Sequence, residues 1–150
     1  LEVHHVPGHA SHQTAFYDPA NDGVFTADAA GAYTPSTDRP RPLTPPPSFD
    51  LEQALADVET LQALDPSALY YSHFGDSEPD GLLEEYAAVL REWVGDIETA
   101  RGRYEDDDAL VEAFVAETDA VDIWGEHKGR GETRMNVRGV LGYLDHRSGD

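Results

Sequence analysis

Hydrophobic and polar positions follow two patterns along this chain, and the first half shows the pattern of strands. The stretches 1–6, 14–17 and 24–26 are short and rich in β-forming residues. Turn residues separate them, namely Pro7-Gly8 after the first stretch and the segment from Asp18 to Gly23 between the other two. The pattern predicts three strands, the last two joined as a hairpin.

The helical pattern begins at Asp50, where apolar side chains start to recur at helical spacing. Asp50 and Gln53 have the spacing of a capping box. Asp65-Pro66 ends this predicted helix, because the residue before a proline avoids helical geometry. A short strand is predicted over 69–72, directly before His73.

The C-terminal half shows the helical period again. One long helix is predicted after Pro79, and the acidic run 106–108 predicts the N-cap of the next helix. The polar, glycine-rich segment 125–131 predicts a linker before a last helix. Gly139 and Gly142 weaken that last helix unless they allow close packing. These helices are expected to cover one face of the sheet.

The segment 34–48, between the two patterns, is rich in proline and has little to bury. Proline has no backbone donor and holds extended geometry, which predicts a stiff surface loop. We interpret the segment as a connector from the sheet to the helix at Asp50. A proline-rich motif that binds a partner is the alternative.

Three residues with metal-binding side chains stand next to the predicted strands. His9 follows the Pro-Gly turn, Asp28 lies just beyond the strand 24–26, and His73 lies at the end of the strand 69–72. A rigid sheet can direct side chains at strand ends to one point. By itself, however, a loop histidine is usually structural, and an aspartate after a strand is usually a turn cap.

The motifs around these three residues resemble the later motifs of the metallo-β-lactamase fold hydrolases, in particular the glyoxalase II-like branch. They are Pro-Gly-His at 7–9, Thr-Ala-Asp-Ala-Ala-Gly at 26–31 and Ser-His-Phe-Gly at 72–75. That superfamily includes β-lactamases, thioesterases, lactonases and RNA nucleases. The resemblance implies an α/β (α+β) fold: the C-terminal half of a four-layer αββα sandwich over residues 1–75, then a helical C-terminal extension over 76–150.

By this resemblance, His9 is a ligand of one metal ion, His73 is a ligand of a second, and Asp28 bridges both. The implied cofactor is a pair of zinc ions, with iron or manganese as alternatives. The chain has no cysteine, so histidine and carboxylate groups must hold any zinc. Water between the ions reaches a pKa of about 7. The resulting hydroxide, oriented by Asp28 as the catalytic residue, attacks an ester, thioester or lactam-type carbonyl.

Two features depart from the family pattern. The chain has Ala27-Asp28 where the family usually has Gly-Asp, which keeps the aspartate and reduces local backbone freedom. The upstream signature His-x-His-x-Asp-His is absent, and a strand begins at once after Leu1, which suggests a fragment. Each ion is left with about two protein ligands, below the three of a catalytic zinc. We therefore expect an incomplete site that binds zinc weakly and turns over little; a catalytically inactive structural or binding module is the alternative.

Other histidines are weaker candidates. His12 is a candidate for a residue that supports the metal ligands or faces the substrate, and an exposed turn histidine is the alternative. His4 and His5 point to opposite faces of a regular strand, so they cannot both reach one site. His127 and His146 lie in a polar context and are expected at the surface.

Charge narrows the range of partners. Asp and Glu number 30 and Lys and Arg number 10, for a formal net charge of −20. Such a surface repels nucleic acids and anionic membranes, so we expect a small-molecule substrate, and RNA or DNA cleavage is the least favoured activity. The composition is typical of a halophilic protein, because concentrated salt screens self-repulsion.

Two further expectations concern location and assembly. The sequence contains neither a signal peptide nor an apolar run long enough to span a bilayer, which predicts a cytoplasmic protein. A missing N-terminal half would leave a sheet face or edge uncovered, which predicts pairing with that half or self-association. A strict monomer during sedimentation in concentrated salt would contradict self-association.

Overall fold

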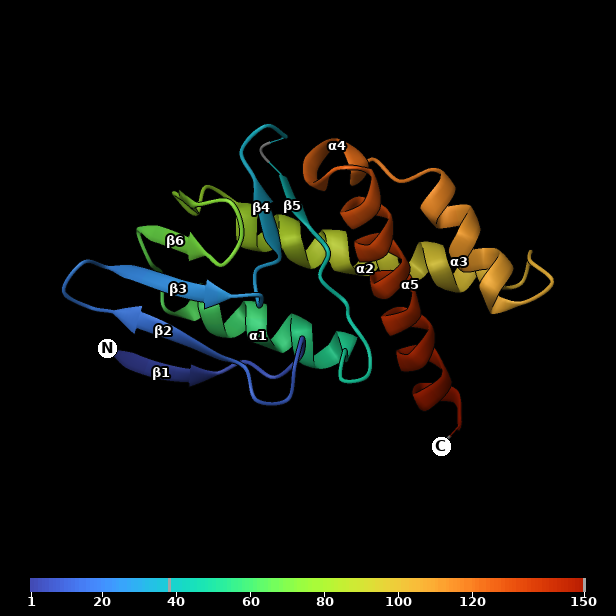
Figure 1. Cartoon of the computed structure of the whole chain (residues 1–150). Helices are drawn as coiled ribbons and strands as arrows, with labels where there is room; N and C mark the ends of the chain where they lie inside the picture. Colours follow the sequence, from blue (N-terminus) through green and yellow to red (C-terminus); the bar gives the residue numbers. More distant parts are fainter. Residues whose placement is uncertain (38, 150) are drawn as a thin grey trace. The chain divides into compact units, whose positions relative to one another are not determined.

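A computed structural model describes residues 1–37 and 39–149 of the 150-residue chain. The fold is mixed α/β with a helical C-terminal extension, which confirms the expected fold class (Figure 1). The chain divides into two compact units, one made of Leu1–Leu43 and Asp50–Arg91, the other of Thr44–Phe49 and Glu92–Asp150. The functional division into residues 1–75 and 76–150 stays a prediction.

The first unit is built on a five-stranded sheet in the order β1-β2-β3-β6-β7. The strands β3 and β6 are parallel, and the other neighbouring pairs are antiparallel. The bounds are β1 Glu2–His5, β2 Thr14–Asp18, β3 Gly23–Ala27, β6 Ala68–Tyr71 and β7 Asp76–Ser77. The four strands predicted from the β-rich stretches 1–6, 14–17, 24–26 and 69–72 are confirmed to within about two residues at each end.

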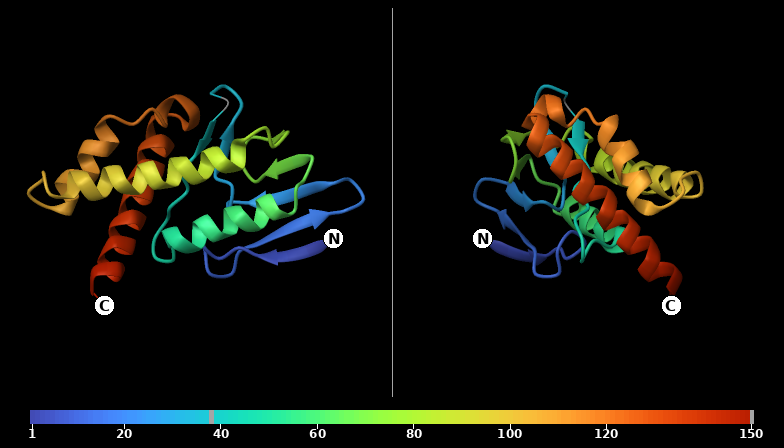
Figure 2. Two further views of the ribbon diagram at one scale, coloured as in Figure 1. Left: turned by 180° about the vertical axis from the view of Figure 1, so that it is seen from behind. Right: turned by 45° about the vertical axis from the view of Figure 1, so that its right-hand side comes forward.

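One face of this sheet is covered by α1, Leu51–Ala63 (Figures 1 and 2). The Asp50 side chain accepts a hydrogen bond from the Gln53 backbone N–H at 2.8 Å, which confirms the predicted cap. The Gln53 side chain does not close the capping box, because it donates to Asp57 instead. The first half of α2, Leu82–Arg101, completes this unit.

The opposite face of the sheet carries an exposed apolar row. Strand register places Val3 beside Phe16, Phe16 beside Phe25, and Phe25 beside Tyr70. Val3 is 63% exposed, Phe16 38% and Phe25 47%. Contiguous exposed apolar side chains of this kind are typical of contact surfaces. The predicted pairing or self-association therefore has a candidate surface, although it stays a prediction.

The prediction of a loop over 34–48 is wrong in part. The chain forms a two-stranded ribbon from β4, Ala32–Thr34, and β5, Arg39–Arg41. Pro40 is tolerated there because a two-stranded ribbon has only edge strands. Beyond the ribbon, Leu43 and Thr44 are buried. Residue 38, within the predicted loop, lies outside the described residues.

The second unit is helical and contains the rest of α2, α3 at Asp107–Ala116, α4 at Val121–Trp124 and α5 at Glu126–Gly149. Asp106 caps α3 by accepting from the Ala109 N–H at 2.8 Å, as predicted. No helix within 1–37 and 39–149 is long and apolar enough to cross a membrane.

The prediction of a linker over 125–131 is wrong, because α5 starts at Glu126. A side chain at Gly129 would lie 2.5 Å from the Val121 backbone nitrogen, so this glycine lets the two helices approach closely. An ion pair between Arg130 and Glu126, one helical turn apart, also supports the first turns. Glycine here serves packing and does not end the helix.

Residues 44–49 pack within the second unit against α5. The Thr44 N–H donates to the Asn136 side-chain oxygen at 2.7 Å, and the Thr44 hydroxyl donates to the Asn136 carbonyl oxygen at 2.8 Å. A Cβ atom at Gly139 would lie 1.7 Å from the Thr44 carbonyl oxygen. Gly139 therefore provides the close packing that the sequence allowed for.

Candidate metal centre

Asp28 and His73 are brought to one edge of the sheet by the parallel pairing of β3 and β6. The carboxyl ends of two neighbouring parallel strands meet at the same edge, and each residue follows one of these strands. The register shifts between Phe25 and Ala27, as in a β-bulge. A bulge bends its strand and changes the direction of the next side chain, here Asp28.

The bend before Asp28 is completed by Ala27, whose φ is +50°. This is the left-handed region, which favours glycine over alanine. The buried Thr26 hydroxyl holds the bend by donating to the Ala27 carbonyl oxygen at 3.1 Å and to the Tyr70 carbonyl oxygen at 3.3 Å. Alanine at position 27 therefore places backbone strain directly beside the candidate site.

His73 lies in the tight turn between β6 and β7. Phe74 has φ +70° and Gly75 has φ +122°, and the Tyr71 N–H donates to the Gly75 carbonyl oxygen at 3.0 Å. The turn reverses the chain immediately after His73. The His73 imidazole therefore lies at the edge of the sheet where Asp28 lies.

His9 is oriented by a hydrogen bond to the backbone of Leu43. The His9 Nδ1 atom lies 3.2 Å from the Leu43 carbonyl oxygen. A carbonyl oxygen can only accept, so Nδ1 carries a hydrogen, and in the neutral ring Nε2 then keeps its lone pair. Metal-binding histidines typically make this contact through their other ring nitrogen.

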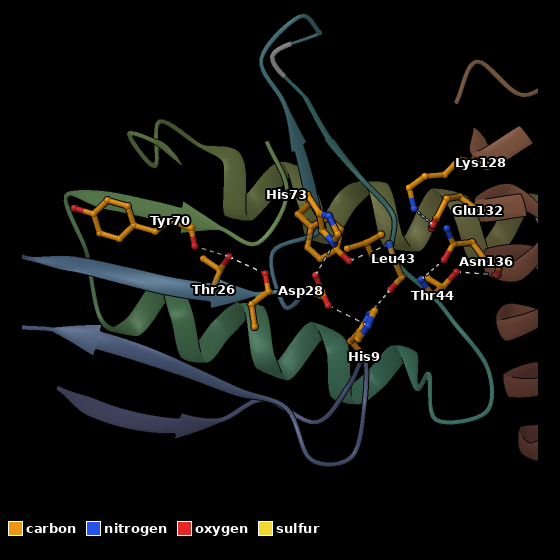
Figure 3. A network of polar contacts seen from close by, with 12 residues as sticks. His9, Thr26, Asp28, Leu43, Thr44, Tyr70, His73, Lys128, Glu132 and Asn136 are labelled. Atoms are coloured by element: carbon orange, nitrogen blue, oxygen red, sulfur yellow. Dashed lines mark hydrogen bonds and ion pairs between the residues drawn. The ribbon is translucent and has the colours of Figure 1, made fainter. Parts of the chain in front are cut away.

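The two imidazoles face opposite oxygens of one carboxylate (Figure 3). The His9 Nε2 atom lies 3.4 Å from Asp28 Oδ2, and the His73 Nε2 atom lies 3.2 Å from Asp28 Oδ1. The side chains are 17% exposed for His9, 24% for Asp28 and 44% for His73. The three residues therefore converge in a partly buried position that solvent can reach.

These residues fit a pair of metal ions. Asp28 Oδ1 is buried and makes no hydrogen bond to the described part of the chain, although the His73 nitrogen is near. Two ligand atoms about 2.0–2.2 Å from one tetrahedral zinc lie about 3.3–3.5 Å apart, close to both observed separations. Imidazole nitrogen and carboxylate oxygen are also the donors that zinc accepts in the absence of thiolate.

The arrangement gives each of the two positions one imidazole and one carboxylate oxygen. Within residues 1–37 and 39–149, no group of three or more His, Cys, Asp or Glu side chains is arranged to hold one ion. A catalytic zinc normally has three protein ligands. Among the described residues, each position therefore has two candidate ligand atoms, and Asp28 contributes to both.

The other histidines lie in different surroundings. His12 is exposed, and its supporting role stays a prediction. His5 Nε2 donates to the Ser11 carbonyl oxygen at 2.9 Å. His4 pairs in register with the buried Ala15, while the neighbouring Val3 pairs with Phe16 on the open face.

Two residues that support His9, Leu43 and Asp57, were not predicted from the sequence. Leu43 supplies the carbonyl oxygen that orients the ring, and the Leu43 N–H in turn donates to the buried Tyr86 hydroxyl at 3.5 Å. Burial raises the pKa of Tyr86 far above its usual value, so its phenol stays neutral. Asp57 binds the turn before His9. An acidic residue within the apolar stripe of α1 was the available signal.

Ala27→Gly is expected to raise the free energy of unfolding by about 0.5–1 kcal/mol. The substitution removes left-handed strain of about 1–2 kcal/mol and adds about 0.5–1 kcal/mol of unfolded-state entropy. Denaturant unfolding in concentrated KCl measures the difference. Ala88→Gly, at an exposed position of α2, is the control with the opposite sign and is expected to destabilise by about 1 kcal/mol. Equal losses in both variants would show that Ala27 is unstrained.

The chain is similar to known proteins in sequence and in fold. The sequence model of the metallo-beta-lactamase superfamily matches residues 1–73, which include His9, Asp28 and His73. A search of curated proteins found no match.

Some solved structures are also similar to this chain. An archaeal metallo-beta-lactamase superfamily protein from Sulfolobus tokodaii superimposes with a TM-score of 0.61 at 22% identity, over 93% of this chain and 44% of that one. A metallo-beta-lactamase family protein from Thermus thermophilus has a TM-score of 0.47 at 19% identity, over 97% and 44% of the two chains. The first likeness shows the fold. The chain spans less than half the length of either protein.

Proposed function

Because residues 1–73 match the metallo-beta-lactamase superfamily, we propose that this chain supplies part of the active site of a metal-dependent hydrolase. The observation that carries the proposal is the convergence of His9 and His73 on the two oxygens of Asp28, at 3.4 and 3.2 Å. The hydrogen bond from His9 to the Leu43 carbonyl supports it, because it leaves Nε2 free to bind a metal ion.

The three residues would together bind two metal ions. His9 and Asp28 Oδ2 would hold one ion, and His73 and Asp28 Oδ1 the other. When bound, a zinc pair supplies Lewis acidity and a nucleophilic water at neutral pH. Asp28 would keep the two positions at a fixed separation and accept a hydrogen bond from the attacking water.

We further propose that the substrate is a small molecule with an ester, thioester or lactam-type carbonyl. The formal charge of −20 disfavours nucleic acids as substrates, because they are polyanions. We also propose, from the same charge, that the protein is halophilic. The complete site would require ligands beyond the two candidate atoms at each position, such as those of an N-terminal half. We also propose that the chain is related to the glyoxalase II-like branch of the superfamily.

A catalytically inactive module is the second candidate. It is favoured by the lack of any three-ligand group within the described residues. In such a protein the three residues would stabilise the sheet edge through the contacts of His9 and His73 with the two Asp28 oxygens.

Metal analysis and hydrolysis assays distinguish the two candidates. We expect the chain, dialysed extensively in concentrated KCl, to retain little zinc, and to bind it when zinc is added back. Slow hydrolysis of a chromogenic ester, thioester or β-lactam is expected with zinc and should cease with a chelator. Failure to bind added zinc or cobalt would overturn the hydrolase proposal. Tight stoichiometric zinc after dialysis would overturn the incomplete site.

A further inference from the structure

The helix α1 buries one carboxylate, that of Asp57, against the turn that carries His9. Asp57 is 2% exposed. Its Oδ2 accepts a hydrogen bond from the Gly8 N–H at 2.6 Å, and its Oδ1 accepts from the Gln53 side chain at 2.9 Å. Both carboxylate oxygens are therefore occupied by donors, one of which lies directly before His9 in the chain.

The Pro7-Gly8 turn is held by α1 from both sides of one residue. While the Gly8 N–H donates to Asp57, the Gly8 carbonyl oxygen accepts from the Asp50 N–H at 3.0 Å. A Cβ atom at Gly8 would lie 2.3 Å from the Ala54 backbone nitrogen. The turn thus lies directly on the first turns of the helix, with no room for a side chain between them.

Core packing alone does not account for a carboxylate at this position. Burial raises the pKa of the Asp57 carboxyl, and the hydrogen bonds from Gln53 and Gly8 oppose that rise. A buried acid of this kind is often less stabilising than an apolar side chain of similar volume. An apolar side chain, however, would leave the Gly8 N–H without a partner and the turn without its link to α1.

We propose that Asp57 is a positioning residue for His9, acting through the Gly8 backbone. Asp57 places the backbone of the turn, and the Leu43 carbonyl sets the rotation of the imidazole. Together they determine where His9 Nε2 stands relative to Asp28 Oδ2. Without the Asp57 contact the turn can shift away from the helix and carry the ligand nitrogen out of range.

This inference rests on the proposed metal site, so its test uses a metal as probe. Co²⁺ binding to the full chain is followed by visible absorption in concentrated KCl, with a chelator competition for affinity. Asp57→Ala is expected to weaken Co²⁺ binding about 10–100-fold, the range for residues that support metal ligands. Asp57→Asn is expected to stay within about 3-fold, because its amide oxygen accepts from Gly8 and a flipped Gln53 amide accepts from its NH₂.

Two controls separate positioning from stability. Leu61→Ala removes a fully buried side chain of the same helix that takes no part in the Gly8 hydrogen bonds, and is expected to leave Co²⁺ affinity unchanged. Asp57→Glu keeps the charge but extends the side chain by one methylene group, and is expected to displace the turn and alter the cobalt spectrum. If Asp57→Ala does not fold, the cobalt affinity and spectrum of Asp57→Glu test the proposal.

The outcomes distinguish this inference from the proposed function. Wild-type cobalt affinity and spectrum in the Asp57→Ala and Asp57→Glu variants, with binding lost in His9→Ala, would overturn the positioning role alone. Unchanged binding in His9→Ala would overturn the metal site itself. An equal loss in Leu61→Ala and Asp57→Ala would reduce Asp57 to a structural residue.

Discussion

Gly139→Ala is expected to lower the free energy of unfolding by on the order of 3 kcal/mol, the largest stability effect we predict. The added methyl group would lie 1.7 Å from the Thr44 carbonyl oxygen, so the segment 44–49 must move away from α5. Overpacking of this kind typically costs about 1–3 kcal/mol. The movement also breaks the two hydrogen bonds between Thr44 and Asn136, each of which leaves a buried polar group unsatisfied.

Gly142→Ala is the matched control, three residues further along the same helix. Nothing lies within 4 Å of a Cβ atom built at Gly142, and the position is exposed. Alanine is there expected to stabilise the helix by about 0.5–1 kcal/mol. Urea unfolding in concentrated KCl measures both variants. Equal and stabilising effects would show that α5 and the segment 44–49 are not packed as described.

The sequence predicts where α1 and α3 begin, but not where α5 begins. Local signals were sufficient for α1, where Asp50 forms the N-cap, and for α3, where Asp106 does the same. The segment 125–131 was misread because glycine disfavours a helix locally, whereas Gly129 is needed for close contact with α4. Propensity is visible in the sequence, and the tertiary contact that overrides it is not.

In the candidate site, too, the local motifs could be predicted and the tertiary contact between them could not. His9, Asp28 and His73 were predicted from short motifs, which require only the residues next to them. Their convergence depends on the parallel pairing of β3 with β6, and a helix separates these two strands in the chain.

The groups that support the site were harder to predict. Leu43 acts through its backbone, which no side-chain pattern can reveal. The position of Asp57 within the apolar stripe of α1 signals its burial, but its partner, the Gly8 N–H, is visible only in the structure. The pairing of β4 with β5 was likewise hidden, since Pro40 argues against a strand.

Asp28→Asn is expected to weaken metal binding more than about 100-fold while the fold is retained. Only a carboxylate presents an anionic oxygen to each of two ions, and the structure places one oxygen toward His9 and the other toward His73. The amide replaces one of them with a nitrogen that does not bind zinc. Because loss of a residue that merely supports a ligand weakens metal affinity about 10–100-fold, loss of the shared ligand is expected to exceed about 100-fold.

The fold should survive because the new amide has a partner. In the metal-free protein its nitrogen can donate to the lone pair on His73 Nε2, which lies 3.2 Å from the replaced oxygen. Asp96→Asn, at an exposed position of α2, removes the same charge and is expected to leave metal affinity unchanged. Zinc titration against a chelator compares the two variants with the parent. Equal zinc affinity in all three proteins would mean that Asp28 does not bridge metal ions, and the inactive module would then be the better account of this sheet edge.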